Sequence, residues 1–565
     1  MRIPATPHAD LDRAVARLAA AKQRWLRVNA ADRGRLLEAV QESFAGVAPR
    51  WVEACLEAEG IPPAHPMAAE EWLAGPYLVL RNLRLLRESL AEIARGRRPR
   101  IPGRVAKRPS GQVTAEVFPA SAWDRVFYPM VTAEVWMEPE VTLEGLAETQ
   151  AVAYFTGVGS GVALVLGAGN VSSIGPMDAL YKLFVENRVV LLKAHPVNDY
   201  LGPLLEEGFA PLVEAGFLAV VYGGAEEGAY LTQHPAVDEV HITGSDKTVE
   251  AIAFGPGPEG QARKAAGRPI LDKPISSELG NVSPVIVVPG SWSRRDLAYQ
   301  AENIVSMLTN NAGFNCNAAR VLVTPRGWSQ RGELLDAIRG QLAAAPTRLA
   351  YYPGAAERWQ RFVDAHPQAE QFGDTRFGRL PWTLIPNLDP GREDDPCFTT
   401  EVFASLFAEV GLPGDDAASF LDQAVRFCNE RLWGTLNATL IADGATQADP
   451  YTGAAFERAL EQLQYGTVTV NHWAAVGYGL VVTPWGAYPG STLTDVQSGE
   501  GFVHNTLMFS AIEKCVVRSL FRAFPKPPWF ASHKTALELA RALTDFERAP
   551  SLVKLPRIGV LALAG

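Results

Sequence analysis

The chain has 565 residues, of which 47% are hydrophobic and 20% charged, and this length exceeds what one hydrophobic core usually holds. Its formal net charge of -10 excludes the basic footprint of a nucleic-acid-binding protein. Five scattered cysteines form no C-x-x-C pair, so we expect neither a disulfide framework nor a metal site. The amino-terminal segment has no apolar core of the signal-peptide kind, and no stretch is apolar enough to span a membrane. These features predict a cytoplasmic protein.

The first part of the chain has the spacing of amphipathic helices. Apolar residues recur every three or four positions through 11–26, 36–44 and 78–93, with charges between them. We therefore expect residues 1–115 to be mainly helical and to pack on the domain that follows, with a loop rich in proline, glycine and arginine at 96–111.

The next part alternates short apolar runs with helical patterns. Apolar runs with no polar alternation predict parallel strands covered on both faces. Residues 116–280 are therefore predicted to form a doubly wound, Rossmann-like α/β domain that binds a dinucleotide at the carboxyl ends of its strands. The expected strands are 162–168, 189–192, 217–222 and one ending at residue 242, with helices at 175–187 and 202–215.

A second α/β pattern begins near residue 284. Strands at 284–288 and 320–324 with a helix at 296–308 predict a catalytic domain over 281–475. Residues 476–565 are expected to form a small oligomerisation element and a tail, with helices at 507–521 and 534–546. We expect the tail to pack on its own subunit or on a neighbour. The alternatives are a lid over a substrate tunnel and a surface that touches membrane.

Cys316 and Glu278 lie at positions where a catalytic role is plausible. Cys316 lies between a helix end and a strand, in NAGFNCNAARV, where backbone N–H groups would stabilise a thiolate or an oxyanion. Glu278 lies in a turn before an apolar strand, and partial burial there would raise its pKa toward that of a general base. Each residue alone is more often structural, as a buried cysteine or a turn cap.

The ends of three predicted strands have sequences that are typical of a nucleotide-binding site. LVLGAGNVSSIGP contains Asn170 in a turn that leads into a helix, and Lys193 ends the run VVLLK. Gly244 and Ser245 follow the strand EVHIT and precede another helix. Backbone N–H groups at such helix starts bind phosphates, although none of the three matches G-x-G-x-x-G.

In order and spacing, these segments resemble the aldehyde dehydrogenase superfamily over about residues 120–490. ELGNVSP resembles the family's ELGGKSP, and NAGFNCNAARV resembles its cysteine motif. GAGN followed by LLKAHP is similar to its Asn and Lys pair, and ITGS to its FTGS turn. TEVFASL and PWGAYPGS resemble the family's E-x-F-G-P and PFGGYKxSG segments.

The resemblance implies a reaction and a set of roles. Cys316 would attack an aldehyde, Asn170 would donate to the oxyanion, and Glu278 would activate the water that hydrolyses the thioester. The implied function is NAD- or NADP-dependent oxidation of a small-molecule aldehyde by a homodimer or homotetramer. The implied cofactor-binding residues are Lys193, Gly244, Ser245, Glu401 and Phe403.

Some features depart from the family or leave alternatives open. Pro196 replaces an acidic residue that excludes NADP in many members, so either cofactor is compatible. The segment 255–273 is an insertion that we expect to be a surface loop. An acyl-CoA reductase and a catalytically silent member are the alternative functions. Glu278 favours hydrolysis over acyl transfer to CoA, and the retained polar residues argue against a silent protein.

Overall fold

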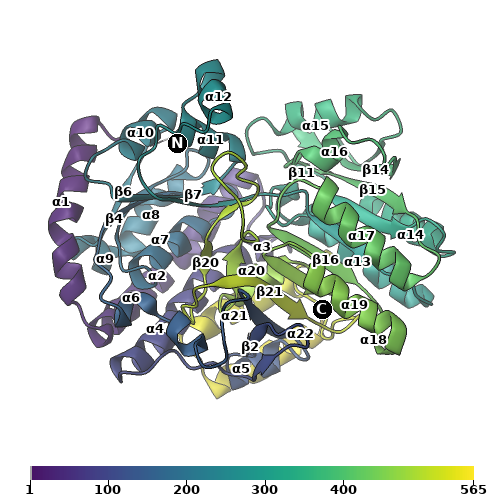
Figure 1. The fold of residues 1–565 in the computed structure, drawn as a ribbon, viewed down its shortest axis with the longest axis horizontal. Helices are drawn as coiled ribbons and strands as arrows, with labels where there is room; N and C mark the ends of the chain where they lie inside the picture. Colours follow the sequence, from purple (N-terminus) through teal and green to yellow (C-terminus); the bar gives the residue numbers. More distant parts are fainter. Residues whose placement is uncertain (1–2) are drawn as a thin grey trace.

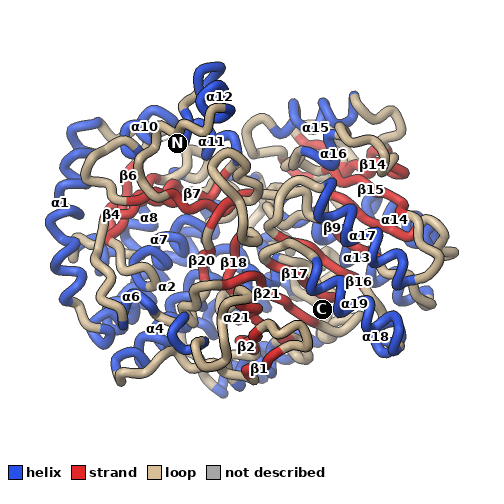
Figure 2. The backbone as a smooth tube through the Cα atoms, viewed as in Figure 1, coloured by secondary structure: helices blue, strands red, loops and turns tan. Residues whose placement is uncertain are grey.

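The computed structural model describes residues 3–565, and two large β-sheets with helices on their faces dominate the fold (Figures 1 and 2). This confirms the predicted α/β class with a Rossmann-like part and a second α/β part. The smaller sheet lies beside the purple and blue helices in Figure 1, and the larger sheet extends through the green half.

The smaller sheet has six strands in the order β19-β8-β7-β4-β5-β6. Strands β8, β7, β4, β5 and β6 are parallel, and β19 is an antiparallel edge strand. Nearly all residues of the parallel strands are buried, which explains why their sequences show no polar alternation. Their bounds are β4 Val162–Leu166, β5 Val189–Lys193, β6 Leu218–Val221, β7 Glu239–Gly244, β8 Ile275–Leu279 and β19 Gly499–Glu500.

Helices from two parts of the chain cover this sheet. The connections between its strands contain α7 Ile174–Phe184, α8 Gly202–Gly208, α9 Ala210–Glu214, α10 Ala225–Thr232, α11 Asp246–Phe254 and α12 Gly257–Ala265. The amino-terminal helices, predicted from their spacing, are α1 His8–Arg27, α2 Ala30–Glu59, α3 Ala68–Trp72 and α4 Leu78–Ala94. Helix α1 packs on β4, β5 and β6, as expected of a helical part that covers the nucleotide domain.

The larger sheet has eleven strands in the order β1-β2-β3-β21-β17-β16-β9-β10-β15-β14-β12. Strands β21 through β14 run parallel, β3, β2 and β1 extend them antiparallel at one end, and β12 is antiparallel at the other. The bounds are β1 Val105–Lys107, β2 Val113–Phe118, β3 Thr132–Met137, β9 Pro284–Val287, β10 Val321–Pro325, β12 Glu370–Phe372, β14 Trp382–Leu388, β15 Leu406–Leu412, β16 Asn437–Ile441, β17 Thr467–Val470 and β21 Ile512–Arg518.

Further helices and short elements complete the fold. The helices are α5 Ala122–Phe127, α6 Val152–Phe155, α13 Arg294–Thr309, α14 Arg331–Ala344, α15 Ala355–Asp364, α16 Pro396–Thr399, α17 Ala417–Arg431, α18 Gly444–Ala448, α19 Pro450–Gln462, α20 Ala475–Leu480, α21 Ala536–Arg548 and α22 Leu555–Leu563. Two small sheets pair β11 Arg348–Leu349 with β13 Arg379–Leu380, and β18 Pro484–Gly486 with β20 Phe502–His504. Segments 116–280 and 476–565 both contribute strands to the larger sheet, and the domain limits remain proposals.

The structure corrects three sequence-based expectations. The tail segment 507–521 is not a helix, because β21 lies between β3 and β17 and both of its faces are covered, so its apolar run lacks alternation. Glu278 lies in β8 rather than in a turn. The insertion 255–273 contains α12, which Pro256 precedes, and Lys264 of α12 pairs with Glu250 at 2.6 Å.

Candidate active site

A cavity of about 1460 Å³ opens where β4, β5 and β7 end at their carboxyl termini. Every site residue predicted from the sequence lines it, so the fold brings together positions that lie up to 233 residues apart in the chain, from Asn170 to Phe403. These residues are Asn170, Lys193, Gly244, Ser245, Glu278, Cys316, Glu401 and Phe403.

A second cavity, of about 400 Å³, also reaches Cys316. Most of its lining is apolar and comes from α3 and α4, the α5 region, the segment around α20 and the carboxyl-terminal tail. Cys316 therefore lies at the junction of two cavities of different character, and a molecule in either one has access to its thiol.

The cysteine loop is shaped by left-handed backbone. Asn311, Ala312 and Gly313 follow α13 with φ values of 50°, 53° and 82°. For residues other than glycine this conformation costs on the order of 1 kcal/mol each, so surrounding contacts must hold it. At Gly313 a Cβ would lie 2.6 Å from the Ala404 carbonyl oxygen, which explains why glycine stands there.

Hydrogen bonds fix Asn170 against the same loop. Its side-chain amide donates to the Phe314 carbonyl at 2.9 Å, and Asn311 donates to the Asn170 carbonyl at 2.7 Å. The Cys316 carbonyl accepts from Ser283 and Asn437, both at 3.3 Å. Within residues 3–565 the Cys316 backbone N–H donates to no other group. The second amide hydrogen of Asn170 and this N–H are therefore free to donate to a ligand in the cavity that both residues line.

Glu278 lies close enough to Cys316 for each group to shift the other's pKa. Burial, together with the nearby Asp178 carboxylate, raises the pKa of Glu278 to about 8. Burial and the Glu278 carboxylate raise the pKa of the Cys316 thiol well above its ordinary value. One Glu278 carboxylate oxygen, Oε1, has no hydrogen-bond partner among the described residues. A buried carboxylate with a free oxygen beside a protonated thiol is arranged to accept a proton.

Glu401 is a second buried carboxylate with a free oxygen. Burial raises its pKa to about 8, although the Arg320 guanidinium opposes the shift. Its carboxylate lies over Gly280, where a Cβ would clash with it, and Oε1 has no partner among residues 3–565. An unpaired buried acceptor that lines a cavity fits a ligand hydroxyl group.

The structure also reveals Arg320 and Arg358, which the motif search did not select. Arg320 is buried and donates to the Gly313 carbonyl at 2.6 Å and the Ala404 carbonyl at 2.8 Å, and burial lowers its pKa to about 10. Arg358 donates to the carbonyls of Val402 and Phe403, both at 3.1 Å. Arg320 therefore holds Ala404 against the cysteine loop, whereas Arg358 ties the neighbouring residues Val402 and Phe403 to α15. The signal for Arg320 was its place in NCNAAR, just before a buried strand, whereas nothing local marks Arg358.

Lys193 lies at the last position of β5 and is buried. Its ammonium donates to the Gly223 carbonyl at 2.7 Å and retains donor capacity toward the cavity. Burial lowers its pKa, although the Glu227 carboxylate opposes this. Burial and Lys193 together lower the pKa of His195 to about 4, so His195 is neutral near pH 7 and adds no positive charge to this end of the cavity.

Gly244 and Ser245 form the turn between β7 and α11, and both line the larger cavity. The Ser245 hydroxyl caps α11 by accepting from the Thr248 N–H at 3.2 Å. The first turn of this helix lines the cavity, and the N–H groups and positive dipole end of a helix start suit an anionic group.

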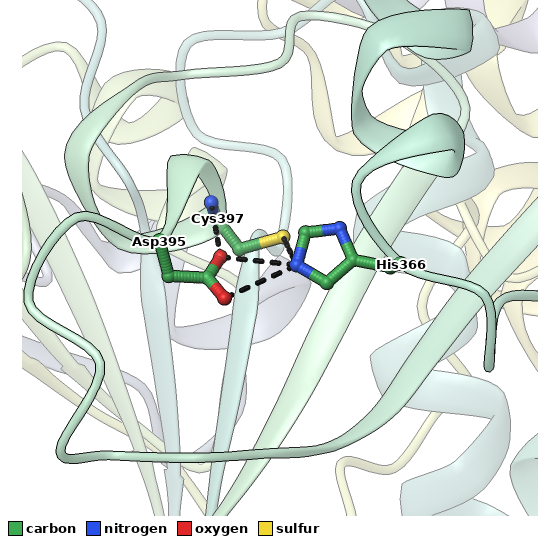
Figure 3. Close-up of side chains that lie close together, drawn as sticks. All are labelled: His366, Asp395 and Cys397. Carbon is green, nitrogen blue, oxygen red and sulfur yellow. Dashed lines mark hydrogen bonds and ion pairs between the residues drawn. The ribbon is translucent and has the colours of Figure 1, made fainter.

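Outside both cavities, His366, Asp395 and Cys397 form a buried cluster (Figure 3). Their donor atoms all lie within 4.8 Å of one another, the spacing of a possible metal site that the sequence did not predict. The His366 Nδ1 atom lies 2.6 Å from the Phe362 carbonyl, and Nε2 lies 3.1 Å from Asp395 Oδ2. Although burial lowers the pKa of His366, these bonds raise it overall, as expected for an imidazolium paired with a carboxylate.

Asp395 also connects this cluster to the cavity. It caps α16, through a bond from the Cys397 N–H at 2.9 Å, and α16 leads directly to Glu401. The ion pair therefore anchors the segment from which Glu401 and Phe403 reach the larger cavity.

The helices of residues 3–565 include none with both the length and the apolarity that crossing a bilayer requires.

Comparisons with known proteins agree with this geometry. Residues 132–344 match the model of the aldehyde dehydrogenase family. A coniferyl aldehyde dehydrogenase from a Pseudomonas species is 26% identical over 314 residues, which cover 52% of this chain and 59% of that protein. The match thus spans less than two thirds of that relative's own length.

Two solved structures share the fold across most of the chain. A Mycobacterium tuberculosis aldehyde dehydrogenase complexed with NAD+ superposes with a TM-score of 0.62 at 18% identity, covering 92% of this chain and 91% of that one. An NADP-dependent glyceraldehyde-3-phosphate dehydrogenase from Bacillus halodurans, complexed with NADP, superposes with a TM-score of 0.60 at 19% identity. The match covers 92% of this chain and 93% of that one. The family model thus matches the middle part of the chain, and the solved structures show that the chain shares the aldehyde dehydrogenase fold.

Proposed function

We propose that this protein oxidises an aldehyde to a carboxylic acid through a thioester on Cys316, with NAD or NADP as the hydride acceptor. The observation that carries the proposal is the position of Cys316 at the junction of the two cavities, beside Glu278. The larger cavity would hold the cofactor, and the apolar one would hold the aldehyde.

The residues of the larger cavity fit a nicotinamide dinucleotide. Glu401 offers an unpaired acceptor, Lys193 a partly free ammonium, and α11 the N–H groups of its first turn. Ribose hydroxyls suit the first two, and a pyrophosphate suits the third. When bound, the dinucleotide would accept the hydride that turns a thiohemiacetal into a thioester.

The chain's own groups account for the remaining steps. As Cys316 Sγ bonds to the aldehyde carbon, the Glu278 carboxylate takes the thiol proton. The Asn170 amide and the Cys316 N–H stabilise the oxyanion, and such donors are each worth on the order of 3 kcal/mol. Glu278 then releases the thiol proton to solvent. After hydride loss, the ionised Glu278 removes a proton from a water molecule as the water oxygen attacks the thioester carbon, and this second proton goes to the departing sulfur. The C–S bond then breaks, and the thiol is restored with the acid as product.

An acyl-CoA reductase is the main alternative. That reaction transfers the acyl group between Cys316 and a CoA thiol and needs no base to activate water. Glu278 is 3% exposed, carries a raised pKa and lies beside the thiol. This arrangement is costly, because its Oε1 atom has no hydrogen-bond partner within residues 3–565. We therefore favour hydrolysis. The predicted homodimer or homotetramer remains a proposal that light scattering would test.

The test is production of reduced cofactor from NAD or NADP with a panel of aldehydes, followed by absorbance. Cys316→Ala should abolish the activity, with a loss of at least about 1000-fold, because no other group supplies the nucleophile. Cys428→Ala is the matched control, since Cys428 is buried in α17 and lines neither cavity. The reductase would be established instead if no aldehyde gave reduced cofactor and an acyl-CoA oxidised the reduced cofactor.

A further inference from the structure

We propose that the second cavity selects uncharged, apolar aldehydes, long aliphatic or aromatic ones, and that helix α22 forms its outer wall. The proposal rests on the function proposed above, because it assigns the cavity to the substrate of Cys316. It is argued from the lining of the cavity, from the charges that face it and from the way its wall is attached.

The lining of the 400 Å³ cavity is mostly apolar, with Asn315 and Asn317 as polar members on either side of Cys316 in the chain. Its volume lies within the range of small-molecule pockets. Its walls include Val171, Ile174 and Tyr478, together with residues of the carboxyl-terminal tail. The outer apolar residues are Phe127, Phe524, Trp529, Leu539, Leu543, Leu555, Ile558 and Leu563. Each methylene buried in such a cavity strengthens binding by about fourfold.

Little charge faces this cavity. Among the described residues, its lining includes no arginine, one lysine and one glutamate. The glutamate, Glu70, is paired with Arg348 at 2.9 Å, and the lysine, Lys526, donates to Ser532 at 2.9 Å at the surface. Burial lowers the pKa of His472 to about 4, so that ring is neutral near pH 7. A carboxylate or phosphate on the substrate tail would therefore be buried without a partner, which is costly.

The inner part of the tail wall is held firmly. Glu547 of α21 bonds to Arg81 at 2.9 Å and to Arg84 at 2.7 Å, both from α4, and these side chains are almost fully buried. Phe546 of α21 packs edge-on against Phe127 of α5, with ring centroids 4.8 Å apart. Figure 1 accordingly shows α21 and α5 close together near the carboxyl-terminal end. Helix α21 is thus a fixed frame of the cavity.

Helix α22 is attached more lightly. Within Leu555–Leu563 only Ile558 is buried, and it points into the cavity lining. On the opposite side, Val560 is 67% exposed and does not line the cavity. Substitutions in α22 therefore alter the cavity wall without changing a residue that we propose to act in catalysis. Because Ala562 also packs against the main hydrophobic core, a thermal unfolding measurement accompanies its substitution.

The first test is the wild-type preference among aldehydes. From propanal to octanal, kcat/KM should rise by up to about fourfold per methylene until the cavity is filled. Succinic semialdehyde and glyceraldehyde 3-phosphate should be poor substrates. A flat series, or a preference for either charged aldehyde, would overturn the proposal while leaving aldehyde oxidation itself intact.

The second test changes the wall. Ala562→Trp places a large ring in the lining, and we expect at least about a tenfold loss of kcat/KM for octanal with propanal changed less than about twofold. Val560→Trp adds the same ring on the exposed side and should change neither value. If the two variants lowered kcat/KM for octanal equally, the assignment of α22 as a wall of the cavity would be contradicted.

A binding measurement separates this proposal from the catalytic one. Calorimetry with Cys316→Ala protein should show octanal binding that Ala562→Trp weakens at least about tenfold in the double variant. If no aldehyde is oxidised but this binding pattern holds, the proposed reaction fails and the cavity assignment stands. If octanal does not bind, the cavity assignment fails.

Discussion

The two cavities that meet at Cys316 are built in different ways. The residues that the sequence predicted for the larger one lie in short motifs, several of them at strand ends and turns, such as Lys193 at the end of β5 and Ser245 after β7. The apolar one is assembled from helices α3, α4 and α5, the α20 region and the tail, which are far apart in sequence. The comparison separates a cofactor side with a recognisable local pattern from a substrate side whose character depends on tertiary packing.

The largest expected effect comes from the residue at the junction. Glu278→Gln removes the base, so steady-state turnover should fall by about 100- to 1000-fold. The first turnover needs no hydrolysis, so a burst of about one equivalent of reduced cofactor should persist. The burst should be slower than in the wild type, because Glu278 also takes the thiol proton, and stopped-flow absorbance would measure its amplitude and rate. If the burst rate fell by the same factor as the steady-state turnover, Glu278 would act mainly in the attack by Cys316 on the aldehyde.

The same residue predicts the pH dependence. Glu278 must be ionised to accept a proton, and its pKa is about 8. The rate should therefore rise about tenfold per pH unit below that value and level off above it. Glu278→Gln should flatten this rise in the hydrolytic step, measured as decay of the acyl-enzyme. An unchanged profile in the variant would assign the titration to another group.

A smaller effect, confined to the cofactor side, is expected from Arg320. Arg320→Met leaves the carbonyls of Gly313 and Ala404 without their donor and loosens the 401–406 segment. We expect a rise of about tenfold or more in KM for the dinucleotide and a loss of about 3 kcal/mol in the free energy of unfolding. Chain-length preference among aldehydes should not change, and a change would show that the two sides are coupled through this loop.

The smallest effect on turnover is expected at the His366 cluster, outside both cavities. Asp395→Asn keeps the α16 cap but removes the charge, and near a pH of about 6 it should cost about 2 kcal/mol of unfolding free energy. Asp394→Asn is the control, because the Asp394 side chain is 88% exposed. Equal denaturation midpoints for the two variants would contradict the ion-pair assignment.

The pH dependence of that difference follows from both partners. The pKa of His366 is raised from 6.5 in the folded protein. The stabilisation that protonated His366 provides is therefore complete below a pH of about 6.5 and is lost as the pH rises through its raised pKa. The hydrogen bond from His366 lowers the pKa of Asp395 from 3.8, although burial opposes this shift. The stabilisation that ionised Asp395 provides is therefore lost as the pH falls through its lowered pKa. The stabilisation should therefore be largest between about 4 and 6.5, as urea titrations at several pH values would show.

The sequence was informative where function depends on local backbone. The alternation of strands and helices predicted the parallel sheets, and short motifs pointed to residues that the fold gathers in one cavity, including Asn170 and Glu401. It failed where context decides conformation. Residues 512–518 have helical apolar spacing, but their place between β3 and β17 makes them a strand. No local signal reported that Glu547 would lie against Arg81, across more than 450 positions, and so fix the tail over the apolar cavity.

The most direct test of the central claim is to trap the acyl group at the junction. Glu278→Gln protein would be mixed with octanal and NAD or NADP, quenched, and examined by intact-protein mass spectrometry and peptide mapping. We predict one octanoyl group per chain, on the peptide that contains Cys316, and none when the cofactor is omitted. Reduced cofactor without an adduct on Cys316, or an adduct on Cys55, Cys397, Cys428 or Cys515, would contradict the account.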